Sequence, residues 1–443
     1  SRLPGMPQAA LFLWRHWIMK KLFLILTLLL YPLTAETQTY TEDVANIINN
    51  NCVVCHRDGG IGPMSFESYE QVRPWAPLIQ LKVASREMPP YAYDQHIGIQ
   101  DLEGDWRLKQ QDIDTIVNWV QSGSPYGNAD IIPQLPNIPN PDDWRFATMF
   151  GQPDLIVASQ SYDIPASGND LWSKEFVNPG ITESKCIKAV QVKPKGSASA
   201  VVHHANSDVY IYDEEGELVP YGQLTEYAMG KWGEIMPPGV CRTMPANSLV
   251  RWDIHMFPGG VGATAEGEMI EDNVVEIGLW FHEDESELNY KQDLRLYPLR
   301  EGYENGHLII PPNGYAMTQG FHSFDHPVRI DSFQPHGHLR MNAASLEIFY
   351  PNTGRTEQIS QISNWSATWH HSHIYAEDRA PLLPTGAVLV IKQWYDNTAN
   401  NPNNPDPDQW VYDGSRTGDE MSHAWIAVTH LDDNGYQQLL ERR

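Results

Sequence analysis

The stretch Gln334-Pro335-His336-Gly337-His338-Leu339 places two imidazoles two residues apart, at the end of a predicted strand over 328–338. On a β-strand, residues i and i+2 point to the same face. His336 and His338 are therefore positioned to bind one metal ion from one side. The motif alone is weak and more typical of two solvated imidazoles at a strand end, so the residues that accompany it decide its meaning.

Short apolar runs separated by Gly and Pro turns continue on both sides of this stretch. Regular short strands of this kind indicate β-sandwiches, and roughly 300 residues are too many for one. The sequence predicts two all-β domains, over 145–300 and 301–443, with a seam near 298–305. The predicted strands span 200–212, 249–257, 274–282, 328–338, 345–350, 387–394 and 424–431.

A helical domain is predicted ahead of them, over 36–130. A first helix is expected from Thr41, followed by acidic residues and an apolar face. A second, over 67–87, contains two prolines that interrupt it. The third spans 109–122 and stops at Gly123. A proline-rich spacer over 131–144 then marks the main domain boundary.

The acidic composition limits the partners. Asp and Glu number 56 against 30 Lys and Arg, so the formal net charge is −26. This charge argues against nucleic acid as a partner. At the N-terminus, a basic Met19-Lys20-Lys21, an apolar run over 22–31 and a small-residue site ending at Ala35 predict an export signal within 1–35. Residues 1–18 precede this signal and fit a mis-assigned start. We expect a periplasmic or secreted protein, with an uncleaved anchor as the alternative.

Cys52-Val53-Val54-Cys55-His56 is the attachment sequence of a c-type haem. Both thiols would form thioethers and His56 would ligate the iron. A redox dithiol or half a zinc site are the alternatives, and neither needs the histidine. Met88 is the favoured sixth ligand over Met64, which sits too near His56 in sequence. The domain resembles small class I c-type cytochromes, an all-α fold that carries one electron at a time.

Further histidines follow the spacer in a defined order. His203 and His204 are adjacent on one predicted strand, and His255 lies on another; Met421 comes just before the last strand. Imidazole suits several metals, whereas a thioether selects copper, so the Met favours copper over zinc. Adjacent strand residues face opposite sides. The histidine pair can therefore share an ion only where its strand bulges or ends.

This order resembles the copper type II, ascorbate-dependent monooxygenases, the peptidylglycine α-hydroxylating and dopamine β-monooxygenase family. The resemblance implies two jelly-roll-like sandwich domains with a solvent cleft between two copper ions. It implies an electron-transfer copper held by His203, His204 and His255. It also implies a dioxygen-binding, catalytic copper held by His336, His338 and Met421.

The chain is therefore predicted to be a copper monooxygenase with two copper ions and one covalent haem c. It would hydroxylate a small organic substrate with dioxygen, taking electrons from an ascorbate-like reductant or a redox protein. The alternative is a copper-handling or electron-carrying haem protein that lacks oxygenase activity. Substrate-binding residues of the animal enzymes have no match in this sequence.

The remaining cysteines and histidines lead to three further predictions. Cys186 and Cys241 are predicted to form a disulfide, with two buried thiols as the alternative. His423, two residues after Met421, fits a group behind the metal ligands or a buried hydrogen-bonded histidine. The cluster Trp369-His370-His371-Ser372-His373 is interpreted as a polar turn, with an accessory metal site or a docking face for the haem as alternatives.

Overall fold

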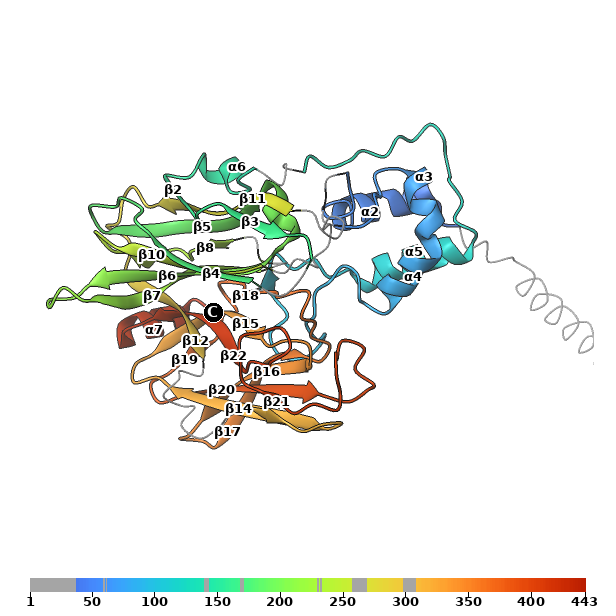
Figure 1. The fold of residues 1–443 in the computed structure, drawn as a ribbon. Coiled ribbons are helices and arrows are strands. Elements are labelled where there is room, and N and C mark those ends of the chain that lie inside the picture. The colour runs from blue at the N-terminus through green and yellow to red at the C-terminus, as the bar shows by residue number, and fades with distance from the viewer. Residues whose placement is uncertain are drawn as a thin grey trace, which may run out of the picture.

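The computed structural model describes residues 37–58, 60, 62–138, 143–167, 171–228, 231, 233–256, 269–297 and 308–443. These residues form mostly β-sheet, arranged as sandwiches, with a few short helices (Figure 1). The predicted export signal and the predicted seam near 298–305 lie outside the described residues.

Helices occupy the three places that the sequence predicts, and in Figure 1 they lie together at one side of the β-sheets. The first helix begins one residue earlier than expected, because the side chain of Thr39 accepts a hydrogen bond from the Glu42 N–H. Pro74 and Pro77 do not break the second region. They open new helical turns, where a missing N–H is tolerated. The helical elements are η1 (Tyr40–Val44), α2 (Ala45–Asn51), α3 (Tyr69–Val72), η2 (Arg73–Trp75), α4 (Ala76–Ala84) and α5 (Gln110–Gln121).

The first sandwich has two layers with an apolar core between them. One layer runs in the order β4 (Leu171–Val177), β10 (Leu249–Met256), β6 (Val202–Tyr212) and β7 (Leu218–Ala228). The other layer is built around β11 (Met269–Phe281), which pairs with three strands. The elements that complete this sandwich are β2 (Leu155–Ala158), β3 (Tyr162–Pro165), β5 (Lys185–Lys195), β8 (Glu234–Ile235), β9 (Val240–Met244), α6 (Ala147–Phe150) and η3 (Gly196–Ala200).

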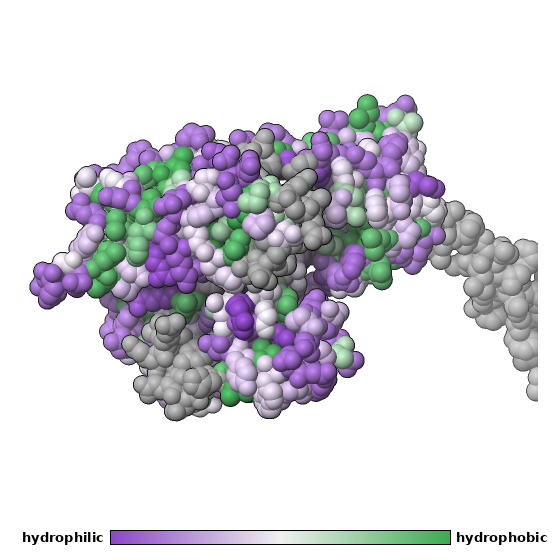
Figure 2. All heavy atoms as spheres, viewed as in Figure 1, coloured by the Kyte–Doolittle hydropathy of each residue, from purple (hydrophilic) through white to green (hydrophobic). Residues whose placement is uncertain are grey.

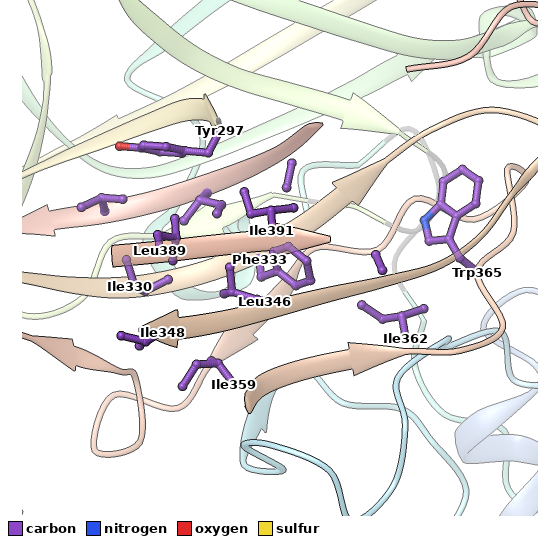
Figure 3. Packing of buried hydrophobic residues seen from close by; sticks show 14 of the residues in the cluster. Tyr297, Ile330, Phe333, Leu346, Ile348, Ile359, Ile362, Trp365, Leu389 and Ile391 are labelled. Carbon is purple, nitrogen blue, oxygen red and sulfur yellow. The ribbon is translucent and has the colours of Figure 1, made fainter. Parts of the chain in front are cut away.

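The second sandwich packs β15 (Val328–His336) and β22 (His423–His430) over a sheet in the order β14, β20, β16, β17. Phe333, Leu346 and Ile391 meet between the layers, and all are buried (Figure 3). The remaining elements are β13 (Ile309–Ile310), β14 (Tyr315–Ser323), β16 (Met341–Tyr350), β17 (Arg355–Ile362), β18 (His373–Tyr375), β19 (Leu382–Leu383), β20 (Val388–Asp396), β21 (Val411–Tyr412) and α7 (Asp433–Glu441). All seven predicted strands are confirmed; the largest displacement is the start of β11.

Strand β12 (Tyr290–Tyr297) joins the two sandwiches. Sequence assigns it to the first β domain, but it pairs with β22 of the second from Lys291 to Tyr297. It also touches β7 and β9 of the first. The two sandwiches therefore share one continuous sheet, in which the strands that carry the candidate histidines lie near one another.

Residues 91–107, within the predicted helical domain, pack on the second sandwich. β1 (Leu102–Glu103) pairs with β18. The Tyr93 hydroxyl lies 2.8 Å from Ser360 Oγ, and the Ile99 N–H donates to the Ile359 carbonyl. Tyr91 and Tyr93 belong to the apolar core of this sandwich. The helical region is thus held to the β-sheets by this segment as well as by the spacer.

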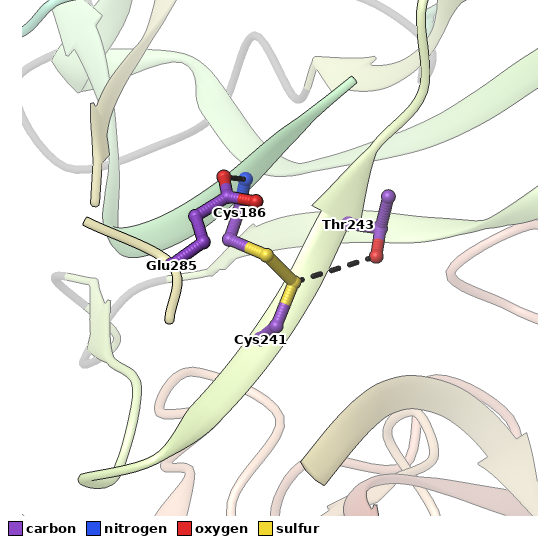
Figure 4. The surroundings of a disulfide bond; sticks show 4 residues. All are labelled: Cys186, Cys241, Thr243 and Glu285. Atoms are coloured by element: carbon purple, nitrogen blue, oxygen red, sulfur yellow. Dashed lines mark hydrogen bonds between the residues drawn. A yellow bond between two sulfur atoms is a disulfide. The ribbon is translucent and has the colours of Figure 1, made fainter. Parts of the chain in front are cut away.

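Cys186 in β5 and Cys241 in β9 form the predicted disulfide, with 5.0 Å between their Cα atoms (Figure 4). The Cys186 N–H donates to the Glu285 carboxylate beside it. Hydrophilic and hydrophobic side chains are interspersed over the visible face of the molecule (Figure 2). Across the described ranges, no helix combines the length and apolar character needed to cross a membrane.

Candidate metal centres

A β-bulge brings His203 and His204 to the same ion-sized space. In the ladder between β6 and β10, His255 is opposite His204, and the next pair is Met256 with Val202. His203 is the residue that the ladder skips. A bulged strand re-aims the side chain at the extra position. We expected that this pair could share an ion only where its strand bulges or ends, and the strand bulges there.

The three imidazoles of His203, His204 and His255 converge. Nδ1 of His204 lies 3.3 Å from Nδ1 of His203 and 3.4 Å from Nδ1 of His255. One ligand atom from each residue lies within 4.8 Å of the others. The indole of Trp172 stacks on His255 with ring centroids 4.4 Å apart, which fixes that ring. We call these three residues the first histidine set.

His336 and His338 lie beside the first set, at the end of β15. The ring centroids of His204 and His336 are 5.9 Å apart, and those of His336 and His338 are 5.4 Å apart. Nδ1 of His338 lies 3.0 Å from the Asp419 carbonyl, which only accepts, so Nδ1 carries the proton and Nε2 is the available ligand atom. The solvent cleft that the family resemblance implies does not separate these rings in this structure.

Glu420 holds the backbone around His338. Its buried carboxylate accepts hydrogen bonds from the N–H groups of His338, at 2.7 Å, and Arg340, at 2.5 Å. Burial raises the pKa of Glu420 to about 7, although the hydrogen bonds from these donors lower it. The sequence predicts no role for Glu420. Only the fold brings residue 420 to residue 338.

Met421 follows directly. The Tyr395 hydroxyl donates to its carbonyl over 2.8 Å, and its N–H faces the Glu420 carboxylate. In the ladder between β15 and β22, His336 is opposite His423, and two more steps of the same register would set residue 338 opposite 421. The backbone of Met421 is therefore placed near His338, and its thioether stays a predicted ligand.

The interpretation of residues 369–373 as a polar turn is wrong. His370, His371 and His373 are 2%, 4% and 2% exposed. His371 and His373 pack among Tyr91, Tyr93, Trp106 and Trp369, in the contact with residues 91–107. His370 faces the other way, toward His336 and His203. The apolar neighbours Trp365 and Tyr375 were the available sequence signal for burial.

Burial favours the neutral form of several imidazoles in this cluster. Burial, followed by neighbouring imidazoles, lowers the pKa of His204, His336 and His370 well below the usual value. His423 stacks on His336 with centroids 4.8 Å apart, and burial lowers its pKa to about 3. Neutral imidazole is the form that ligates metal ions, so these four rings can bind an ion without first losing a proton.

The candidate haem site is built around His56. Its Nδ1 lies 3.1 Å from the Met64 carbonyl, which directs Nε2 to the opposite side of the ring. Phe66 stacks on the imidazole at 4.5 Å, and a Cβ at Gly62 would come within 2.5 Å of Nδ1. Cys52 and Cys55 are half-buried free thiols.

Met88 and Met64 lie in different surroundings. Met64 packs against the apolar core of the helical region, and its carbonyl faces Nδ1 of His56. Met88 lines a cavity of about 50 Å³ together with Tyr91 and Arg107. It therefore lies at the start of the segment that packs on the second sandwich.

Comparison with known proteins leaves this chain without a family. No protein-family model matches the sequence, and no curated protein matches it. Solved structures with a partial likeness include an alpha-L-fucosidase candidate from Bacteroides ovatus ATCC 8483 (10% identity, TM-score 0.17), PNGF-II (10% identity, TM-score 0.24) and the infectious bursal disease virus VP2 subviral particle (10% identity, TM-score 0.19). The matches cover 67%, 74% and 59% of this chain, and 41%, 71% and 76% of those chains, so the chain spans less than half of the fucosidase candidate. Scores this low carry no argument about function.

Proposed function

We propose that this chain is an exported copper-dependent monooxygenase that hydroxylates a C–H bond of an organic substrate with dioxygen, with electrons delivered through a fused c-type haem. The observation that carries the proposal is the convergence of His203, His204 and His255 on one point beside His336 and His338. A chain built only for β-sandwich stability has no use for five buried or half-buried imidazoles in one place.

The residues present fit copper. Three imidazoles alone suit copper or zinc. The second set adds Met421, whose backbone N–H shares the Oε2 atom of Glu420 with the N–H of His338, and a thioether ligand favours copper. Trp172 and Glu420 hold the ligands of the two sets, one through its ring and the other through backbone N–H groups. Such outer partners fix the orientation of metal ligands.

The residues around His56 fit a c-type haem. The two thiols and the imidazole belong to the attachment sequence, and the carbonyl of Met64 orients the imidazole as carbonyls commonly orient metal-bound histidines. The thioether of Met88 remains the favoured sixth ligand, because the backbone of Met64 occupies the Nδ1 side of His56.

Two copper ions, when bound and reduced, would supply the two electrons that, with two protons, reduce one oxygen atom of dioxygen to water while the other enters the C–H bond, and a bound haem would supply electrons singly. The fold itself contributes by holding the metal ligands close together in a largely buried cluster. Tyr91, three residues after Met88, stacks on His371 at 5.3 Å, and His371 adjoins His370 in the histidine cluster. This contact between the helical region and the histidine cluster supports the proposal that the haem delivers electrons to the metal centres.

Export is supported by two features. The disulfide between Cys186 and Cys241 is of a kind that persists outside the cytoplasm. The sequence of residues 19–35 is typical of a signal peptide.

Metal analysis with EPR on the purified protein tests the proposal. We expect two type II copper ions and one low-spin haem per chain. Met421→Ala should alter one copper signal, whereas Met317→Ala, a change of an exposed methionine in β14, should alter neither. Bound zinc, or a single copper insensitive to Met421→Ala, would overturn the monooxygenase.

A second experiment separates the enzyme from an electron carrier. The ascorbate-reduced, copper-loaded protein is mixed with air-saturated buffer, and copper oxidation is followed with oxygen consumption. Oxidation by dioxygen that slows in Met421→Ala supports the enzyme. A protein that stays reduced in air is a carrier.

A third experiment addresses the haem. Met88→Ala should shift the haem absorption and raise the sensitivity of the iron to added ligands, while Met64→Ala should leave both unchanged. The reverse result would assign the sixth ligand to Met64.

A further inference from the structure

His370 faces His336 across a sheet register that the sequence does not reveal. β18 pairs with β15 through Phe333 opposite His373 and Ser332 opposite Ile374. Three further steps of this register set residue 370 opposite 336. Residues opposite each other in an antiparallel pair project to the same face. Both residues lie three positions beyond the last pair of this ladder, where its continued register would set them opposite each other, and neither is more than 2% exposed.

The geometry between these two rings is that of ligands sharing one ion. Their Nδ1 atoms are 3.3 Å apart, and their ring planes meet at 77° with centroids 5.0 Å apart. His423, on the other side of His336, stacks on it with planes 18° apart. Nitrogen lone pairs lie in the ring plane, so nearly parallel stacked rings do not direct theirs to a common point, whereas steeply crossed rings can.

His370 also contacts the first histidine set. The ring centroids of His370 and His203 are 5.5 Å apart. The Ala367 carbonyl, three residues before His370, lies 3.3 Å from His203 Nε2. The segment before β18 thus reaches both sets.

We propose that His370 is a third imidazole ligand of the copper centre at His336 and His338, so that this centre holds three imidazoles with the Met421 thioether as a fourth ligand. The inference rests on the proposed function, because it concerns the second of its two copper ions. It adds a residue outside the ligand set that the family resemblance implies. The competing explanation is a structural hydrogen bond between two neutral histidines.

Copper titration of the full-length protein distinguishes these explanations. Wild-type protein and His370→Ala are loaded with Cu(II), dialysed and analysed for copper per chain, and dissociation constants are measured by chelator competition. We expect one of two copper ions to bind about 10–100-fold more weakly in His370→Ala, or to be lost. His373→Ala is the matched control. His373 is as buried as His370 and comes from the same segment, but it contacts Tyr91 and Tyr93, so the variant should keep both ions.

A measurement on the wild-type protein keeps the test independent of variant folding. Pulsed EPR and X-ray absorption count the imidazoles bound to copper. Six imidazoles over two ions support the proposal, and five overturn it. Two copper ions held with unchanged dissociation constants in His370→Ala also overturn it and leave the proposed function standing. A wild-type protein that takes up no copper overturns both.

Discussion

Gln334 and Glu226 join the two sandwiches beside the metal centres: Nε2 of Gln334 donates to Oε2 of Glu226 over 2.5 Å. Both side chains are 1% exposed. Gln334 lies two residues before His336 on β15. Glu226 lies on β7, two residues before Ala228, which is opposite His204. This hydrogen bond therefore links β15, which carries His336, to β7, which pairs with the strand that carries His203 and His204.

Replacing Gln334 by Leu should destabilise the protein and loosen the spacing of the two sets. The buried Glu226 carboxylate would lose this partner, at a cost of about 2–3 kcal/mol. Urea unfolding measures the loss. In the copper-loaded protein, weaker dipolar coupling between the two Cu(II) EPR signals should accompany it. Gln319→Leu, a change of an exposed glutamine in β14, is the control. Unchanged coupling in Gln334→Leu would show that the strands hold their spacing without this bond.

Glu420→Gln should weaken the His336 and His338 centre selectively. Each carboxylate oxygen accepts from two backbone N–H groups, and an amide has one oxygen acceptor, so its NH2 would face donors. We expect about 10–100-fold weaker copper binding at this centre and unchanged binding at the first histidine set.

Asp419→Asn is the matched control for Glu420→Gln. The Asp419 side chain pairs with the exposed Arg416, while its carbonyl, which faces Nδ1 of His338, is retained in the variant. Equal effects of the two changes would mean that charge near the centre, and not the backbone contacts of Glu420, controls its affinity.

Gly98→Ala should detach residues 91–107 from the second sandwich. Gly98 has a φ of 68°, and a Cβ there would lie 2.0 Å from the Ile359 carbonyl oxygen. Gly104→Ala separates the two penalties, because Gly104 has a φ of 64° but no atom within 4 Å of such a Cβ. We expect Gly104→Ala to cost about 1 kcal/mol in unfolding and Gly98→Ala clearly more, with faster proteolysis between 90 and 108. Equal costs would show that the segment is not tightly held there.

The strands were predictable because short apolar runs bounded by turn residues are local signals. The ladder around His336 shows this: β15 begins at the predicted Val328, and its apolar residues Ile330 and Phe333 enter the core. The three residues of the first histidine set were likewise identified from their order along the chain.

What could not be predicted depends on pairing between distant strands. The bulge at His203 exists only relative to β10, so the sequence of β6 alone does not show it. The sequence around His370 does not distinguish an exposed turn from a core, and its burial depends on how the segment before β18 lies against β15 and the first histidine set. β1 has two residues, too few for any periodicity, yet it docks the helical region on the second sandwich.

Low pH should lower the free energy of unfolding through Glu234, a buried carboxylate in the first sandwich. Burial alone would raise its pKa, but the charges of Arg242 and Lys231, at 2.6 and 3.0 Å, outweigh burial and lower the pKa to about 2. Its ordinary value is 4.5. The folded-state pKa is thus below the unfolded one, so this contribution is complete above pH 4.5 and is lost as the pH falls toward 2. A shift of this size corresponds to roughly 3 kcal/mol.

Glu234→Gln reports this contribution when the metal-free variant and wild type are unfolded in urea at several pH values. Because the amide leaves Arg242 without its carboxylate and Lys231 with Glu226 alone, at 3.6 Å, we expect a cost of about 3–5 kcal/mol at pH 7. The difference from wild type should shrink steadily between pH 4.5 and pH 2, where the wild-type carboxyl takes up a proton. Glu215→Gln, at an exposed turn, should show a small difference that does not follow this course. A gap that stays constant down to pH 2 would mean that Arg242 and Lys231 stabilise the fold by packing rather than through the charge of Glu234.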